Sequence, residues 1–209
     1  MQIPDLTFDG PTHTYYFKGR RVPNVTLALK MLLNYSRIPP DVLERARIEG
    51  VHIHRMAELY FKRDLDEDSL PDWLRPRLAA LKAFEQETGF VVEATEKRVY
   101  HPGHFFAGTL DLAGELSGLK KKGRAIIDIK RSLYAGPVVG YQTAAYQEAE
   151  NAERRRTKQP KIQHRFALQL QPNGRYKLTE YGDPGDFHVF LACLTLLKVG
   201  ATIYETEHA

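Results

Sequence analysis

The chain has 209 residues, of which 43% are hydrophobic and 27% are charged, and its formal net charge is +4 with a pI of about 9.1. This length favours one domain with a substantial core and leaves too little chain for two comfortable ones. The single cysteine, Cys193, excludes an internal disulfide and any zinc or iron–sulfur centre held by several thiolates, and its apolar surroundings predict that it packs in the core.

The basic balance fits a nucleic-acid or phosphate partner. The first five residues, Met1 to Asp5, lack the basic and apolar regions of a signal peptide. The longest apolar run is too short to cross a bilayer. From these features we expect a cytoplasmic protein that makes no contact with a membrane.

In chain order, the aromatic run 13–17 lies between turn signals and predicts a short N-terminal hairpin. Thr26 is the expected N-cap of a helix over 27–33. Pro39-Pro40-Asp41 opens a longer helix that we expect to end near Lys62. A third helix is expected from about Asp72 to the stop signal at Gly89.

The pattern then changes to three β-prone runs, 90–100, 105–116 and 124–131. A helix over about 138–156 follows, and Asn173-Gly174 joins strands 164–170 and 176–178 in a hairpin. Asp186 is the expected cap of the last helix. The order predicts an α+β fold with a mixed β-sheet core, flanking helices and a helical N-terminal third. We expect one domain over 1–209, with a hairpin and helical region at 1–89 and the β-sheet core and C-terminal helix at 90–209.

The apolar strand 125–130 contains Asp128 and Lys130, and the two-residue period of a strand places both on one face. Burying these charges costs several kcal/mol unless something compensates them. They form either an ion pair at a strand end or a metal site with a lysine beside it. Hairpin-like pairing would add Asp111 from the preceding run, and clustered carboxylates repel unless a cation lies between them. Oxygen ligands of this kind suit Mg²⁺ or Mn²⁺.

More motifs accompany these residues, in the order Gly50-x-x-x-His54, Glu96, Gly108-x-x-Asp111, Asp128-x-Lys130 and Gln142-x-x-x-Tyr146. This order resembles the PD-(D/E)XK nuclease superfamily, and more narrowly its RecB/lambda-exonuclease/Cas4-like branch. The resemblance spans about 50–146 and implies a restriction-endonuclease-like fold for a single nuclease domain. Because Gln142 and Tyr146 are four residues apart, they share one face of their helix.

The resemblance also implies a role for each residue. Asp111, Asp128, the backbone carbonyl of Ile129 and His54 would bind Mg²⁺ or Mn²⁺. Lys130 would be the catalytic lysine, Glu96 an assisting acidic residue, and Gln142 and Tyr146 would position DNA or the lysine. Glu93 is the alternative to Glu96, and His52 is the alternative to His54. The ordinary alternatives are a surface ion pair of Glu96 with Arg98, a partly exposed His54, and simple helix packing for Gln142 and Tyr146.

The chain departs from parts of that branch. It has no phosphate-binding glycine loop of a motor domain, and one cysteine cannot hold the iron–sulfur cluster of many Cas4-type relatives. The resemblance therefore implies a small phage-type exonuclease that acts on DNA ends or single strands in recombination or repair. An endonuclease of the same fold and a non-catalytic DNA-end-binding module remain alternatives. A phage recombination or single-strand-binding protein would be its protein partner.

Several basic clusters and exposed rings are candidates for contacts with DNA. The basic clusters are Arg45, Arg47 and Arg55; Lys120 to Lys122 with Arg124; and Arg154 to Arg156 with Lys158 and Lys161. The rings that could stack on bases are Tyr15, Tyr16 and Phe105, whereas Phe106 is expected to pack in the sheet. Each basic cluster could equally be an ordinary solvated face.

Overall fold

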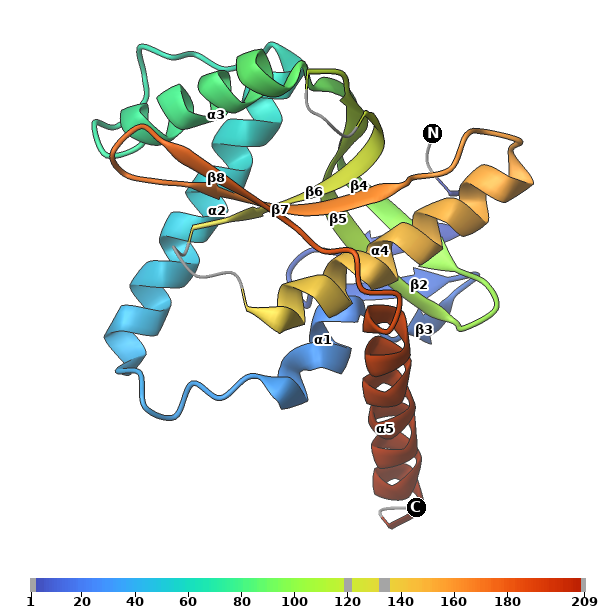
Figure 1. Cartoon of the computed structure of the whole chain (residues 1–209). Coiled ribbons are helices and arrows are strands. Elements are labelled where there is room, and N and C mark those ends of the chain that lie inside the picture. The colour runs from blue at the N-terminus through green and yellow to red at the C-terminus, as the bar shows by residue number, and fades with distance from the viewer. Residues whose placement is uncertain (1–2, 119–121, 132–135, 208–209) are drawn as a thin grey trace.

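The computed structural model describes residues 3–118, 122–131 and 136–207, which form five α-helices and two β-sheets (Figure 1). The small antiparallel sheet consists of β1 (Leu6–Asp9), β2 (Thr14–Phe17) and β3 (Arg20–Val22). The large sheet has the order β4 (Val91–His101), β5 (Phe106–Leu116), β6 (Gly123–Lys130), β7 (His164–Leu170) and β8 (Tyr176–Glu180). The helices are α1 (Val25–Leu29), α2 (Pro40–Lys62), α3 (Arg75–Thr88), α4 (Pro137–Arg156) and α5 (Asp186–Glu207), with a 3₁₀ turn η1 (Lys30–Leu32) after α1.

The large sheet is mixed because β6 and β7 are parallel whereas the other neighbouring strands are antiparallel. A parallel pair needs a long crossover, and α4 provides it between the two strands. In Figure 1, α4 crosses one side of the sheet while α2 and α3 lie on the other. The predicted α+β class, with a mixed sheet and flanking helices, is therefore confirmed.

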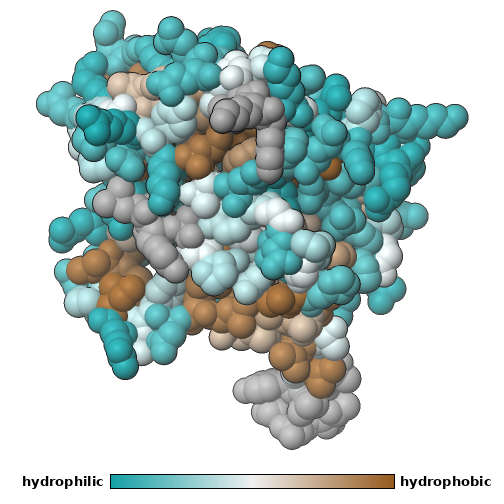
Figure 2. Space-filling model, in the orientation of Figure 1, coloured by the Kyte–Doolittle hydropathy of each residue, from teal (hydrophilic) through white to brown (hydrophobic). Residues whose placement is uncertain are grey.

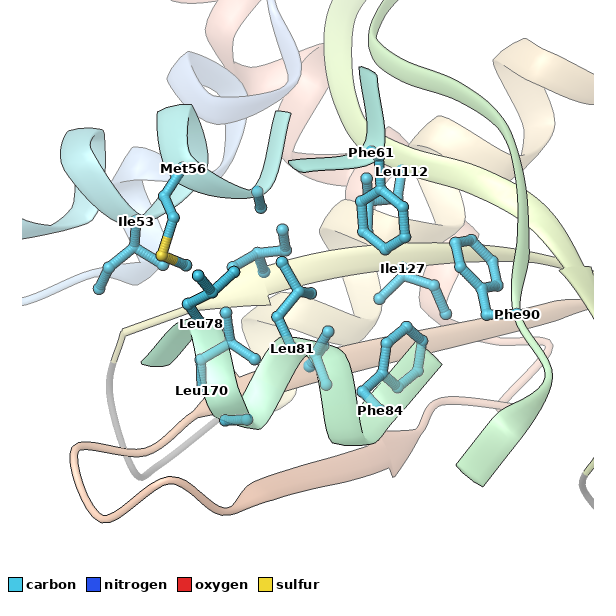
Figure 3. Close-up of a cluster of buried hydrophobic side chains, with 14 of the residues drawn as sticks. Ile53, Met56, Phe61, Leu78, Leu81, Phe84, Phe90, Leu112, Ile127 and Leu170 are labelled. Carbon is cyan, nitrogen blue, oxygen red and sulfur yellow. The ribbon is translucent and has the colours of Figure 1, made fainter. Parts of the chain in front are cut away.

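On one face of the sheet, apolar side chains of α2 and α3 pack against the central strands (Figure 3). Ile53 and Phe61 of α2 meet Leu81 of α3, Leu112 of β5 and Ile127 of β6 in one buried cluster. Each of these five side chains is buried, so transfer of their apolar surface from water is the main force that seats α2 on the sheet. The position of His54 on α2 follows from this packing.

On the other face, α4 packs with α1 and α5 against β5 and β6. Ala145 and Ala149 of α4 let the helix approach closely, and Phe106, Ile126 and Phe190 complete this cluster. Cys193 is buried in the same cluster, as the sequence predicts, and so is Phe106. None of the helices in the described part of the chain combines the length and the apolar character that crossing a membrane requires.

Several predicted boundaries are confirmed closely. The second helix begins at Pro40, with proline in its first turn, and ends at Lys62. Gly89 closes α3 in the left-handed conformation that favours glycine, with φ of 57°. The Asn173-Gly174 turn joins β7 and β8 as an antiparallel hairpin. At these places, proline fixes the backbone angle φ or glycine allows a positive φ, so the local sequence is enough to set the boundary.

The predicted N-terminal hairpin is present as β1 and β2, and β3 adds a third strand to it. Two predictions about the first helix were wrong. Thr26 is not the N-cap of the first helix, since the Asn24 side chain accepts a hydrogen bond from Leu27 N at 2.6 Å. That helix ends at Leu29 and tightens into η1 before residue 33.

The start of α3 also differs, because the turn from 72 to 74 precedes a helix that begins only at Arg75. Asp186 is the first residue within α5, and its carboxylate accepts a hydrogen bond from the buried Arg165 at 3.1 Å. It therefore ties α5 to β7, in place of the expected role as the helix cap.

Gly108 of β5 offers a test of the packing beneath α4. A Cβ added there would lie 2.6 Å from Cε1 of Tyr146 and 3.2 Å from Cγ2 of Val25. Because all three residues are buried, we expect Gly108→Ala to lower the free energy of unfolding by about 1–3 kcal/mol in urea denaturation. Gly50→Ala is the matched control: nothing lies within 4 Å of a Cβ at this helical glycine, so alanine should stabilise by about 0.5–1 kcal/mol. Equal effects at both glycines would contradict this account.

Candidate functional site

The residues of the sequence motifs meet in a cleft of about 640 Å³ between α2, α4, β4 and β5. The cleft lining includes Gly50 and His54 from α2, Glu96 from β4, Gly108 and Asp111 from β5, and Gln142 and Tyr146 from α4. Asp128 and Lys130 adjoin it at the end of β6, where Lys130 contacts Gln142. These motif residues, up to 96 positions apart from Gly50 to Tyr146, thus line one cavity.

The centre of the cleft is a group of one imidazole and two carboxylates. His54 Nδ1 lies 3.3 Å from Asp111 Oδ1 and 3.8 Å from Glu96 Oε1. One ligand atom from each of the three residues lies within 4.8 Å of the others, so the group is compact enough to surround a metal ion. Asp111 is nearly buried, while His54 and Glu96 each keep about one third of the side chain exposed to the cleft.

The backbone of β4 is distorted at Glu96. Its φ is 46°, in the left-handed region that residues other than glycine rarely adopt. The flanking Thr95 and Lys97 pair with Leu112 and Leu110, which puts Glu96 at the level of Asp111. A backbone of this kind costs about 1–3 kcal/mol and is found where the surroundings, often at functional sites, hold it in place.

The second oxygen of Asp111 links β5 to β6. Asp111 Oδ2 accepts a hydrogen bond from the backbone N–H of Ile129 at 2.6 Å. In a strand, the N–H and C=O of one residue point to the same side, so the carbonyl of Ile129 also points toward β5. This orientation is compatible with the ligand role that the sequence resemblance implies for that carbonyl.

Asp128, Lys130, Gln142 and Tyr146 form a connected polar chain. Lys130 Nζ lies 2.7 Å from Asp128 Oδ2 and donates to Gln142 Oε1 at 3.2 Å. Gln142 Nε2 then donates to the hydroxyl of Tyr146 at 3.2 Å. Gln142 therefore contacts Lys130 directly, as a residue that positions the lysine would. The prediction that Gln142 and Tyr146 share one helical face is confirmed.

Opposite charges shift the pKa values of the central group. Burial alone would lower the pKa of His54, but Asp111 and Glu96 outweigh it and raise the pKa to about 10. Burial alone would raise the pKa of Asp111, yet His54, Lys130 and the N–H of Ile129 hold it below its usual value. Burial keeps the pKa of Glu96 above its usual value despite His54. In the metal-free protein, the imidazolium of His54 thus supplies the cation that the two carboxylates require.

The pKa values of Asp128 and Lys130 are shifted by burial and by the charges around them. Burial and the nearby Asp111 raise the pKa of Asp128 to about 6, even though Lys130 opposes them. Burial lowers the pKa of Lys130, but Asp128 and Asp111 reverse this and raise it. Asp128 Oδ2 is buried, and in the described part of the chain the ammonium of Lys130, at 2.7 Å, is the one polar partner found for it. A buried carboxylate oxygen of this kind is a good ligand for a cation.

The two alternatives from the sequence, His52 and Glu93, lie outside the cleft. His52 is exposed and contacts the Trp73 ring edge-on at 6.0 Å between centroids. Glu93 accepts hydrogen bonds from Arg124 at 2.8 Å and Arg154 at 2.5 Å. The structure therefore brings His54 and Glu96 to Asp111. The alternative ion pair of Glu96 with Arg98 does not form: Arg98 lies over the ring of Phe8 at 5.3 Å, and Glu96 pairs with His54.

The donor set fits the expected divalent cation. His54, Glu96, Asp111 and Asp128 together provide three carboxylates and one imidazole. Carboxylate ligands suit Mg²⁺ and Mn²⁺, and the imidazole makes Mn²⁺ the better match. Asp128 is not part of the compact triad, because its carboxylate is turned to Lys130.

The basic clusters divide into structural and accessible residues. Arg154 is buried and bound to Glu150 and Glu93, so it belongs to the fold and not to a free basic surface. Arg47 and Arg55 line the cleft, each with an ion pair to a glutamate of α2. Of the predicted loop Lys120 to Lys122, the first two residues lie outside the described residues, and Lys122 is exposed.

Two features of the site have no signal in the sequence. Tyr15 is buried, and its hydroxyl forms a hydrogen bond with Thr109 at 2.8 Å, so it holds the small sheet against the cleft and cannot stack on bases as predicted. Arg131, directly after Lys130, forms an ion pair with Glu49 at 2.8 Å and joins β6 to α2. Both contacts link segments more than 80 residues apart, and no local pattern predicts such pairs.

No family model and no curated protein matches this sequence. The site consists of the compact group of His54, Glu96 and Asp111 and, beside it, the buried Asp128 with its ion-pair partner Lys130.

The raised pKa of His54 predicts a pH-dependent stability of the metal-free protein. Because the folded value is about 10 and the unfolded value about 6.5, the stabilisation is complete below pH 6.5 and is lost as the pH rises toward 10. The loss is at most about 1.4 kcal/mol per pH unit, and less because the side chain is one third exposed. Urea denaturation in EDTA should show this fall in the wild type and a smaller one in His54→Gln. Identical pH dependence in both proteins would contradict the prediction.

Proposed function

We propose that this protein is a metal-dependent DNA nuclease of the PD-(D/E)XK type, with a restriction-endonuclease-like core. The observation that carries the proposal is the gathering of Asp111, His54 and Glu96 in one cleft, with the buried Asp128 and its ion-pair partner Lys130 beside it on β6. An unneeded buried charge is costly, and a simple ion pair would require only one carboxylate for one ammonium. Three carboxylates, an imidazole and a lysine together match the requirements of phosphodiester hydrolysis.

The metal would be held by Asp111, Asp128 and His54, with the carbonyl of Ile129 and with Glu96 in reach of the same group. When bound, Mg²⁺ or Mn²⁺ supplies a Lewis acid that lowers the pKa of a coordinated water and neutralises negative charge on the phosphate. His54 must lose its proton to act as a ligand, so metal binding releases a proton from this site.

Lys130 has a role that depends on its charge. Asp128 and Asp111 keep it protonated, and Gln142 holds its ammonium at 3.2 Å. A positioned ammonium can orient an attacking water or stabilise negative charge that develops on the phosphate. Gln142 is in turn held by Tyr146, which packs against Gly108 beneath the cleft.

Arg45 is exposed on α2, and Arg47 and Arg55 reach the edge of the cleft, where they would contact phosphates without reading bases. Action on DNA ends, in phage-type recombination or repair, follows from the resemblance to the RecB/lambda-exonuclease/Cas4-like branch and not from the geometry. We therefore propose an exonuclease without an iron–sulfur cluster.

The central test is metal-dependent cleavage. Purified protein should degrade end-labelled linear DNA in Mg²⁺ or Mn²⁺ and not in EDTA. Asp128→Asn and Lys130→Gln should each lower the rate by at least about 100-fold, because each removes a charge that acts on the reacting phosphate. Glu93→Gln is the matched control, since Glu93 lies outside the cleft and should change the rate less than tenfold.

Absence of metal-dependent cleavage on every substrate would refute the nuclease proposal. Covalently closed circles, single- and double-stranded, provide the second arm of the assay. An exonuclease leaves them intact, so their cleavage at the linear rate would exclude action restricted to ends while leaving the nuclease assignment in place.

Metal binding can be measured without turnover. Mn²⁺ at about 100 times its Kd should stabilise the wild type against unfolding by about 2.7 kcal/mol. Asp111→Asn should abolish this gain, because Asp111 belongs to the compact group and also anchors Ile129. A gain of equal size in Asp111→Asn would show that the ion binds elsewhere.

A further inference from the structure

A second cavity, of about 1040 Å³, opens next to the cleft and is mostly apolar. Its apolar and aromatic lining comes from Val22, Pro23, Leu27, Leu33, Tyr35, Phe105 and Leu197. We call this cavity the α1 groove, because α1 and the chain on either side of it provide much of the wall. Figure 2 shows hydrophobic surface over α1 and the neighbouring part of α5.

The α1 groove adjoins the candidate active site. His13, Asn24 and Thr26 line both cavities. A chain molecule whose phosphate lies in the cleft can therefore extend into the groove past these three residues. The groove thus belongs to the path that a long substrate would follow.

The charges of the two cavities are complementary to different parts of such a substrate. The cleft contains the carboxylates Glu58, Glu96 and Asp111 together with Arg47 and Arg55, so acidic and basic side chains are mixed there. The α1 groove contains Arg21, Lys30 and Lys198 and no acidic side chain. Within the described residues, Arg21 and Lys30 form no ion pair, and both are exposed. The groove is therefore suited to hold the phosphates of a strand that continues beyond the cleft.

The apolar wall of the groove favours single-stranded over duplex DNA. Tyr35 is 47% exposed and Leu27 is 38% exposed, so their side chains are available to a ligand. A duplex hides the faces of its bases within the stack and offers mainly phosphates to a protein. Unpaired bases, in contrast, stack on aromatic side chains while a basic groove follows the backbone.

From this juxtaposition, we propose that the α1 groove binds the single-stranded segment of a DNA substrate whose scissile phosphate lies in the adjacent cleft. Bases stack on Tyr35 and lie against Leu27 and Phe105, and Lys30 and Arg21 contact phosphates. The inference rests on the proposed nuclease function and specifies its substrate: DNA that carries an unpaired strand next to the cleavage site.

Binding can be tested apart from catalysis. A fluorescently labelled oligothymidylate of about 12 nucleotides, within the range that single-strand-binding folds cover, is titrated by anisotropy in EDTA, where no cleavage occurs. Tyr35→Ala should weaken binding by about fivefold or more, because one stacked base is lost. Tyr35→Phe keeps the ring and should retain the wild-type Kd. Lys30→Gln should lower the slope of log Kd against log salt by about 0.7, whereas Lys177→Gln on the exposed side of β8 should leave it unchanged.

Equal affinity of the wild type, Tyr35→Ala and Lys30→Gln for the oligonucleotide would overturn the proposal. So would a change of oligomeric mass in Tyr35→Ala by sedimentation, because the groove would then be covered by a second copy of the chain. If the variants weaken binding in EDTA but no substrate is cleaved with Mn²⁺, the groove stands as a single-strand site and the nuclease function fails. If cleavage is metal-dependent but the variants bind normally, the nuclease stands and the groove proposal fails.

Discussion

The close approach of Asp111 and Asp128, with Lys130 beside them, sets the conditions for the rest of the site. Buried carboxylates repel each other unless a cation balances them. Lys130 balances Asp128 at 2.7 Å, and the imidazolium of His54 balances Asp111 at 3.3 Å. Helices α2 and α4 must therefore be held firmly against opposite faces of the same strands, because each contributes a partner to this group of charges.

Apolar packing holds α2 and α4 against the sheet. Ile53 and Met56 of α2 are buried on either side of His54 in the sequence, so the helix backbone that carries the imidazole cannot shift without disturbing the core. On the other face, Tyr146 fills the space that the absent side chain of Gly108 leaves. The ion pair between Glu49 and Arg131 adds a polar link between α2 and the end of β6. The polar site thus takes its geometry from two apolar clusters.

Charge is distributed unevenly around this centre. The cleft mixes carboxylates with Arg47 and Arg55, and the carboxylates at its centre need a cation before a phosphate can lie against them, whereas the adjoining α1 groove has only basic charges among its lining residues. A substrate that spans both would bind through the groove and react in the cleft. Substitutions in the groove should therefore change the affinity for the substrate, whereas substitutions in the cleft should change the rate of cleavage.

The sequence alone determined the main elements and the pairs that lie close along the chain. A strand period of two places Asp128 beside Lys130, and a helical spacing of four places Gln142 beside Tyr146. Only the tertiary structure decided between His54 and His52, and between Glu96 and Glu93, because each pair lies on one element and differs only in what that element faces. The left-handed backbone at Glu96, the burial of Arg154 and the contact of Tyr15 with Thr109 likewise depend on long-range packing. Local periodicity determines the direction of a side chain on its own element, whereas its partner depends on how the elements are assembled.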